Sequence, residues 1–192
     1  KENAELLKAY QKDPFVQSRL SSFINTENII LSRQAAEVAR QLPSDKVYSV
    51  EYYAIITSLM QSGLYEQAIE LVDESIDRAN NYLEEVAAIR THAGLLFVLG
   101  KSQEGRKKFQ LAADIFSSKY NNVNQYSKAF TNFNTYIMWS GVELGVGNCQ
   151  ESKVRFEQGK QQFAAFNTTS SQNNPLKNQL ETANRLISEK CK

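Results

Sequence analysis

The stretch from Tyr52 to Ala79 limits the possible folds most strongly, because Gly63 divides it into two segments with helical apolar periodicity. Before the glycine, apolar residues recur on one helix face, and after it they follow an i, i+3, i+4, i+7 pattern. Gly63 can adopt the left-handed backbone that ends a helix without a steric cost. Tyr65 and Ala68 then place a large and a small side chain on one face of the second helix. The pattern predicts two helices packed closely as an antiparallel hairpin.

The same arrangement of a glycine and a small residue recurs along the chain. Gly100 and Gly105 follow Gly63 and Ala68 by 37 residues each, and Ala35 precedes Ala68 by 33 residues. Offsets of about 34 residues are typical of repeats built from helix pairs. The chain therefore reads as a series of related hairpins.

The best-formed hairpin resembles a tetratricopeptide repeat. Gly63, Tyr65, Ala68 and Ile69 match the Gly-x-Tyr-x-x-Ala-[Ile/Leu] pattern that leads into the second helix of that repeat. The resemblance implies a binding scaffold. It also implies an all-α superhelix, of about four antiparallel hairpins plus a C-terminal capping helix.

We expect one domain over 1–192, divided into a degenerate N-terminal hairpin, three further hairpins and the capping helix. The corresponding ranges are 1–43, 46–80, 82–118, 126–166 and 175–190. Helices are predicted over 82–99, 102–118, about 126–144, 149–166 and 175–190. An Asn-rich connector over 119–126 and a polar linker over 167–175 separate the later elements.

Charge and apolar content exclude several classes of partner. The 22 basic and 21 acidic residues leave a net charge of +1, which gives no bulk electrostatic attraction for nucleic acid or an anionic membrane. No apolar run approaches the roughly 18 residues of a membrane span. We expect no nucleic-acid partner and no direct membrane span.

The sequence offers no constellation for catalysis. His92 is the single histidine, and the residues one turn away from it are apolar, so we expect a histidine packed at a hairpin seam rather than a metal ligand. No nucleophile elbow, phosphate loop or dinucleotide-binding glycine pattern occurs. Trp139 falls close to the inward apolar stripe and reads as a core residue. We expect a protein without catalytic activity, cofactor or metal.

Two cysteines begin and end the last helix pair. Cys149 opens the helix predicted over 149–166, and Cys191 follows the capping helix over 175–190. If these helices of similar length are antiparallel neighbours, the two sulfurs can reach bonding distance. A disulfide would then tie down the C-terminal helix and indicate an oxidising compartment. The alternative is two unrelated thiols.

In tetratricopeptide arrays the first helix of each hairpin lines a concave groove, so the resemblance implies a set of groove-facing residues. These are Tyr53, Thr57, Met60, Gln61, Arg90, Gly94, Phe97, Asn134, Ile137 and Gly141. The set is aromatic and aliphatic with one Arg, and it lacks the basic cluster of family members that clamp a carboxylate. An apolar peptide or helix therefore suits it better than an acidic tail. Alternatively, the chain's own terminal helix or a second copy covers these residues.

The leading hypothesis is a non-enzymatic scaffold for protein–protein interaction that binds an apolar peptide or helix in a concave groove. One alternative is a structural or self-association module of a larger protein, with the groove serving a homodimer. Another is a sensor domain for small signal peptides, with a closed pocket around Arg90 and Tyr53. The possible disulfide favours an extracytoplasmic location, either periplasmic, lipid-anchored or secreted.

Overall fold

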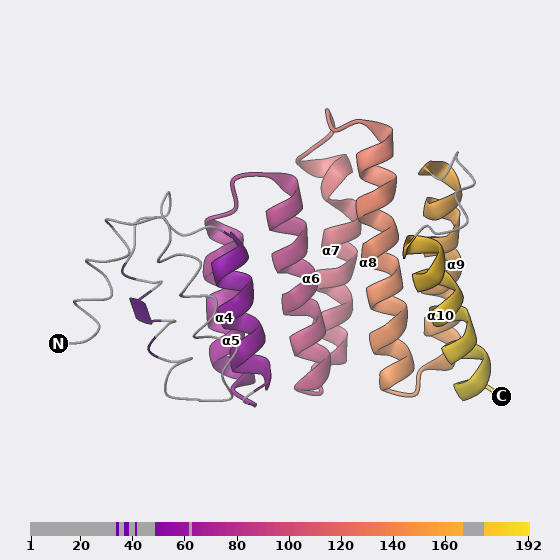
Figure 1. The fold of residues 1–192 in the computed structure, drawn as a ribbon, viewed down its shortest axis with the longest axis horizontal. Helices are drawn as coiled ribbons and strands as arrows, with labels where there is room; N and C mark the ends of the chain where they lie inside the picture. The colour runs from indigo at the N-terminus through magenta and orange to yellow at the C-terminus, as the bar shows by residue number, and fades with distance from the viewer. Residues whose placement is uncertain (1–33, 35–36, 39–40, 42–48, 62, 167–174) are drawn as a thin grey trace. The chain divides into compact units, whose positions relative to one another are not determined.

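The computed structural model describes residues 49–61, 63–166 and 175–192, together with positions 34, 37–38 and 41. Throughout these ranges the regular secondary structure is α-helical, which confirms the predicted all-α class. The helices are α4 (Ser49–Gln61), α5 (Tyr65–Asp77), α6 (Tyr82–Val98), α7 (Ser102–Ser118), α8 (Gln125–Gly145), α9 (Cys149–Phe166) and α10 (Pro175–Lys190) (Figure 1). The bounds predicted for α7, α9 and α10 are confirmed to the residue. The degenerate hairpin predicted over 1–43 lies almost wholly outside the described residues, as does the linker over 167–174.

The chain separates into two compact units, with the boundary between Ala88 and Ile89 inside α6. In the first unit α4 and α5 pack against each other, and apolar side chains from both helices form the core. These side chains are Ile55, Ile56, Leu59, Ala68, Leu71 and Val72. The apolar periodicity predicts all of them except Leu71, whereas four other residues of the predicted stripe are only half-buried: Met60, Tyr65, Ile69 and Ile76.

The turns of three hairpins share one backbone geometry. Gly63, Gly100 and Gly147 have φ of +73°, +74° and +79°, a region that residues with a Cβ rarely adopt. In each turn the residue after the glycine donates its N–H to the carbonyl five residues earlier, over 2.8 to 2.9 Å. This bond satisfies a carbonyl that the end of the helix would otherwise leave unpaired.

A small buried residue follows each of these glycines by five positions. It is Ala68 in α5, Gly105 in α7 and Ser152 in α9. A Cβ on Gly105 would lie 2.5 Å from the Phe97 ring and 3.0 Å from the Ala93 carbonyl oxygen, so a side chain does not fit there. The small residue therefore allows the second helix of the hairpin to approach the first closely.

The second unit holds two apolar clusters around α8. One joins Ala93 and Phe97 of α6 to Phe109 of α7 and Trp139 of α8. The other joins α8 and α9 to Ile187 of α10. Trp139 is 2% exposed, which confirms its prediction as a core residue. Among the described helices, none is both long enough and apolar enough to cross a bilayer.

Candidate functional site

A groove of about 420 Å³ lies between α8 and α10 in the second unit. From α8 it is lined by Ile137, Ser140, Gly141 and Leu144. The residues from α10 are Pro175, Asn178, Gln179, Thr182, Ala183, Leu186 and Ile187. Helix α10 thus supplies more of the lining than α8. A groove of this size is within the range of sites that hold small ligands or short peptide segments.

The lining of the groove is uncharged. Aliphatic side chains form much of it, with Leu144 and Ile187 contributed by the cluster that joins α8, α9 and α10. Asn178, Gln179 and Thr182 add polar groups along α10 and are exposed. Such a surface favours an apolar, uncharged partner, because a charged group placed there would lose hydration without gaining an opposite charge.

The hydroxyl of Ser140 is already engaged by α9. Ser140 Oγ donates to the carbonyl oxygen of Ser152 at 2.8 Å, and Ser152 Oγ donates to the carbonyl oxygen of Ser140 at 2.9 Å. Both residues are buried, so these bonds satisfy groups that would otherwise be costly to bury. They join α8 to α9 at Ser140, one of the residues that line the groove.

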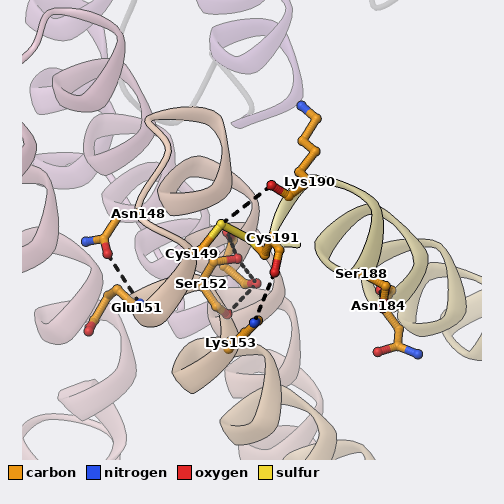
Figure 2. The surroundings of a disulfide bond; sticks show 10 residues. Asn148, Cys149, Glu151, Ser152, Lys153, Asn184, Ser188, Lys190 and Cys191 are labelled. Carbon is orange, nitrogen blue, oxygen red and sulfur yellow. Dashed lines mark hydrogen bonds between the residues drawn. A yellow bond between two sulfur atoms is a disulfide. The ribbon is translucent and has the colours of Figure 1, made fainter.

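Helix α10 is attached at its C-terminal end by a disulfide between Cys149 and Cys191, as predicted (Figure 2). Their Cα atoms lie 5.6 Å apart. Because Cys149 is the first residue of α9 and Cys191 directly follows α10, the two helices run antiparallel. Close to the bridge, Lys153 Nζ donates to the carbonyl oxygen of Cys191 at 3.4 Å. Of the α10 residues, Ile187 is buried, whereas the other apolar ones that pack on the cluster are half-buried. The disulfide therefore supports a helix that has a modest apolar contact.

A buried carboxylate lies next to the groove residue Leu144. Glu143 is fully buried and accepts four hydrogen bonds. Arg106 of α7 donates from Nε at 2.7 Å and from Nη2 at 2.8 Å, Trp139 donates from Nε1 at 3.0 Å, and Asn148 donates from Nδ2 at 3.1 Å. The two bonds from Arg106 form a bidentate ion pair that links α7 to α8.

The ion pair keeps Glu143 charged inside the protein. Burial alone would raise the pKa of this carboxyl, but the hydrogen bonds from Arg106, Trp139 and Asn148 together with the charge of Arg106 lower it below 4.5. The same hydrogen bond to Glu143 raises the pKa of Arg106. A carboxylate that is ionised, fully buried and already bonded by four donors is poorly suited to proton transfer. We therefore assign Glu143 a structural role.

Trp139 completes this link between helices. Its ring stacks on Phe109 with centroids 5.5 Å apart and planes tilted by 10°, and the guanidinium of Arg155 lies 3.6 Å from its centroid. Arg155 is in turn paired with Glu151. A cation over an indole face adds electrostatic attraction to the apolar contact. The tryptophan thus connects side chains from α7, α8 and α9.

Two of the residues predicted to face a concave groove lie one turn apart on α8 and line a different groove. These are Ile137 and Gly141, which line the groove between α8 and α10. Phe97 is 4% exposed and packs in the aromatic cluster, because the missing side chain at Gly105 leaves room for its ring. Asn134 is half-buried, and its amide donates to a backbone carbonyl of α8. Gly94 is also buried.

The remaining predicted residues belong to α4 and to the part of α6 that lies in the second unit. Tyr53 is 56% exposed, Met60 is half-buried, and the Thr57 hydroxyl donates to the Tyr53 carbonyl at 2.8 Å. Arg90 is half-buried. The side chain of Gln61 lies outside the described residues. The concave groove along α4, α6 and α8 stays a prediction.

The sequence analysis allowed a terminal helix over the predicted groove residues, but it did not predict that α10 lines a groove with Ile137 and Gly141, and it did not predict the burial of Glu143. The sequence does contain a signal for the burial of Glu143. Glu143 precedes Gly147 by four residues, as Leu59 precedes Gly63 and Leu96 precedes Gly100. Both leucines are buried, so aligning the turns would have placed the carboxylate in the core.

Comparison with known proteins adds nothing to these observations, since no protein-family model, curated protein or solved structure matches the chain. Within the described residues, no group of three or more His, Cys, Asp or Glu side chains is placed to hold a metal ion.

Proposed function

We propose that this protein is a non-enzymatic scaffold that binds an uncharged, apolar segment of a partner protein between α8 and α10. The observation that carries the proposal is the uncharged groove of about 420 Å³, which has an aliphatic lining and a polar rim. It lies on packed helices that the Ser140–Ser152 bonds and the Cys149–Cys191 bridge hold in place. A site that is already formed loses little conformational entropy when it binds.

The proposed architecture is a superhelix similar to tetratricopeptide repeats. Three turns with a left-handed glycine, each followed five residues later by a small buried residue, support it. Related hairpins of this kind stack into arrays that present extended binding surfaces. In this arrangement α10 acts both as the terminal cap and as one wall of the groove.

We further propose that the protein works in an oxidising compartment outside the cytoplasm. The support is the disulfide that holds α10, because such bonds persist where thiols are not kept reduced. An oxidising compartment would also preserve the groove, because the disulfide holds α10, the helix that supplies most of the groove's lining.

Selection from a display library of random peptides tests the proposed binding, with the oxidised protein immobilised. We expect enrichment of peptides that are apolar and uncharged. Selection of acidic or basic peptides, or no enrichment over beads that carry an unrelated protein, would contradict the proposal. Sedimentation equilibrium over a range of concentrations separates this function from self-association. A monomer supports partner binding, whereas a dimer whose formation blocks the selected peptides would assign the groove to a second copy.

A further inference from the structure

We infer that the groove between α8 and α10 binds its partner segment in an extended conformation, with the side-chain amides of Asn178 and Gln179 and the hydroxyl of Thr182 pairing with the segment's backbone. This inference rests on the proposed function and specifies the form of the ligand. Its basis is the row of polar side chains that α10 presents to an otherwise aliphatic groove: Asn178, Gln179 and Thr182.

These polar groups are available for a ligand. Asn178 and Gln179 are exposed, and their side-chain amides make no hydrogen bond within the described part of the chain. Each amide carries both a donor and an acceptor, as a peptide group does. A peptide laid in the groove can therefore exchange paired hydrogen bonds with them, as it would with the edge of a sheet.

The spacing on α10 fits an extended chain. Asn178 and Thr182 lie four residues apart, or about 6 Å along the helix axis. In an extended peptide, the backbone groups that face one side recur every second residue, which is roughly 6.6 Å. A helical ligand satisfies its backbone groups internally and leaves none along its length to pair with amides. The polar side chains of α10 can therefore form hydrogen bonds with the backbone of an extended ligand but not with that of a helical one.

The length and the floor of the groove complete the description of the ligand. Pro175 and Ile187 lie twelve residues apart on α10, or about 18 Å at 1.5 Å per residue. About six extended residues span this distance. Because side chains alternate along an extended chain, every second residue would face Ile137, Leu144 and Leu186. The expected ligand alternates apolar residues with residues that face solvent.

Four capped peptides of matched length test the inference, with binding followed by fluorescence anisotropy. The first alternates Val and Ser and favours an extended form. The second and third are the same peptide N-methylated at every Val or at every Ser, so that each loses the N–H donors of one edge. The fourth is rich in Leu and α-aminoisobutyrate and is helical. We expect the first to bind, and one of the two methylated peptides, the one methylated on the paired edge, to bind about tenfold more weakly, as the loss of a hydrogen bond predicts.

Variants of α10 provide the matched comparison. Asn178→Leu removes an amide from the groove, and Asn184→Leu removes one from an exposed position of α10 outside it. We expect about tenfold weaker binding of the Val–Ser peptide to the first variant and unchanged binding to the second. Binding of both methylated peptides equal to that of the unmethylated peptide, or tighter binding of the helical peptide, would overturn the extended form while leaving the proposed function intact. Failure of every peptide here and in the library selection would instead overturn the proposed function.

Discussion

The burial of the ion pair between Arg106 and Glu143 predicts that replacing Arg106 destabilises the protein more than replacing Glu143 does. The Arg106 side chain is 27% exposed, whereas that of Glu143 is 0% exposed. Arg106→Met keeps the apolar part of the side chain but leaves a buried carboxylate without its cation. Breaking a buried pair in this way costs about 3–5 kcal/mol of unfolding free energy. We expect Arg106→Met to lose an amount in this range.

Removing the carboxylate should cost less. Glu143→Leu places in α8 the residue that stands at the matching position before the other two glycine turns, Leu59 and Leu96. The guanidinium of Arg106 can then turn toward water, and the main loss is the buried N–H of Trp139, worth about 1–3 kcal/mol. The double variant should lose no more than Glu143→Leu alone, because Arg106 then has no buried partner.

Urea denaturation at neutral pH measures these differences. Trp139 is the single tryptophan of the chain and bonds to Glu143, so its fluorescence reports unfolding of this part of the protein. Circular dichroism on the same samples checks that the variants keep their helices. Equal losses for the two single variants, or a double variant whose loss is their sum, would refute the reasoning about burial.

Acid provides a second check on the same pair. Since the folded pKa of Glu143 lies below 4.5, the stability that its charge contributes is present above this pH and is lost as the pH falls through the folded pKa. In Arg106→Met, burial without the cation raises the folded pKa above that of the unfolded chain, so protonation favours the folded form. The difference in unfolding free energy between wild type and Arg106→Met should therefore shrink as the pH falls from neutral toward this range. A constant difference would show that Glu143 is not the group involved.

Two further predictions concern packing and the disulfide. Gly105→Ala should lower the free energy of unfolding by about 1–3 kcal/mol, and the thermal midpoint with it, because the new Cβ would meet Phe97. Gly141→Ala should raise the free energy of unfolding by about 0.5–1 kcal/mol, because nothing lies within 4 Å of the added Cβ. Replacing Cys149 and Cys191 by Ser should cost about 2–4 kcal/mol and speed amide hydrogen exchange in α10, as mass spectrometry would detect. Unchanged exchange would mean that packing alone holds the helix.

The helix bounds could be predicted because their signals are local. Gly63 and Gly100 stop helices through a backbone conformation that few other residues adopt, and Pro175 opens one. The disulfide could be proposed from the order of elements, since the ends of two helices of similar length meet if the helices are antiparallel neighbours, and the structure confirms the bond. Predicting these features does not require knowing which helix packs on which face of its neighbour.

The groove could not be predicted in the same way. Its walls depend on where α10 lies against α8, and periodicity fixes which face of a helix is apolar but not what that face contacts. The burial of Phe97 depends on Gly105, a residue on a different helix. The buried charge of Glu143 required Arg106 from α7, 37 positions away in the sequence. Side chains whose environment depends on residues distant in the sequence are therefore the hardest to predict from the sequence.

Two glycines of α8 allow the most direct test of the binding site. Gly141 lines the groove and Gly145 does not, yet a Cβ at either would meet nothing within 4 Å, so both positions tolerate a side chain. The measurement is the binding of library-selected peptides to Gly141→Phe and to Gly145→Phe, each checked for wild-type thermal stability. The proposed site predicts that Gly141→Phe abolishes binding while Gly145→Phe binds as the wild type does. Unchanged binding to Gly141→Phe would contradict the proposal that the groove between α8 and α10 holds the partner.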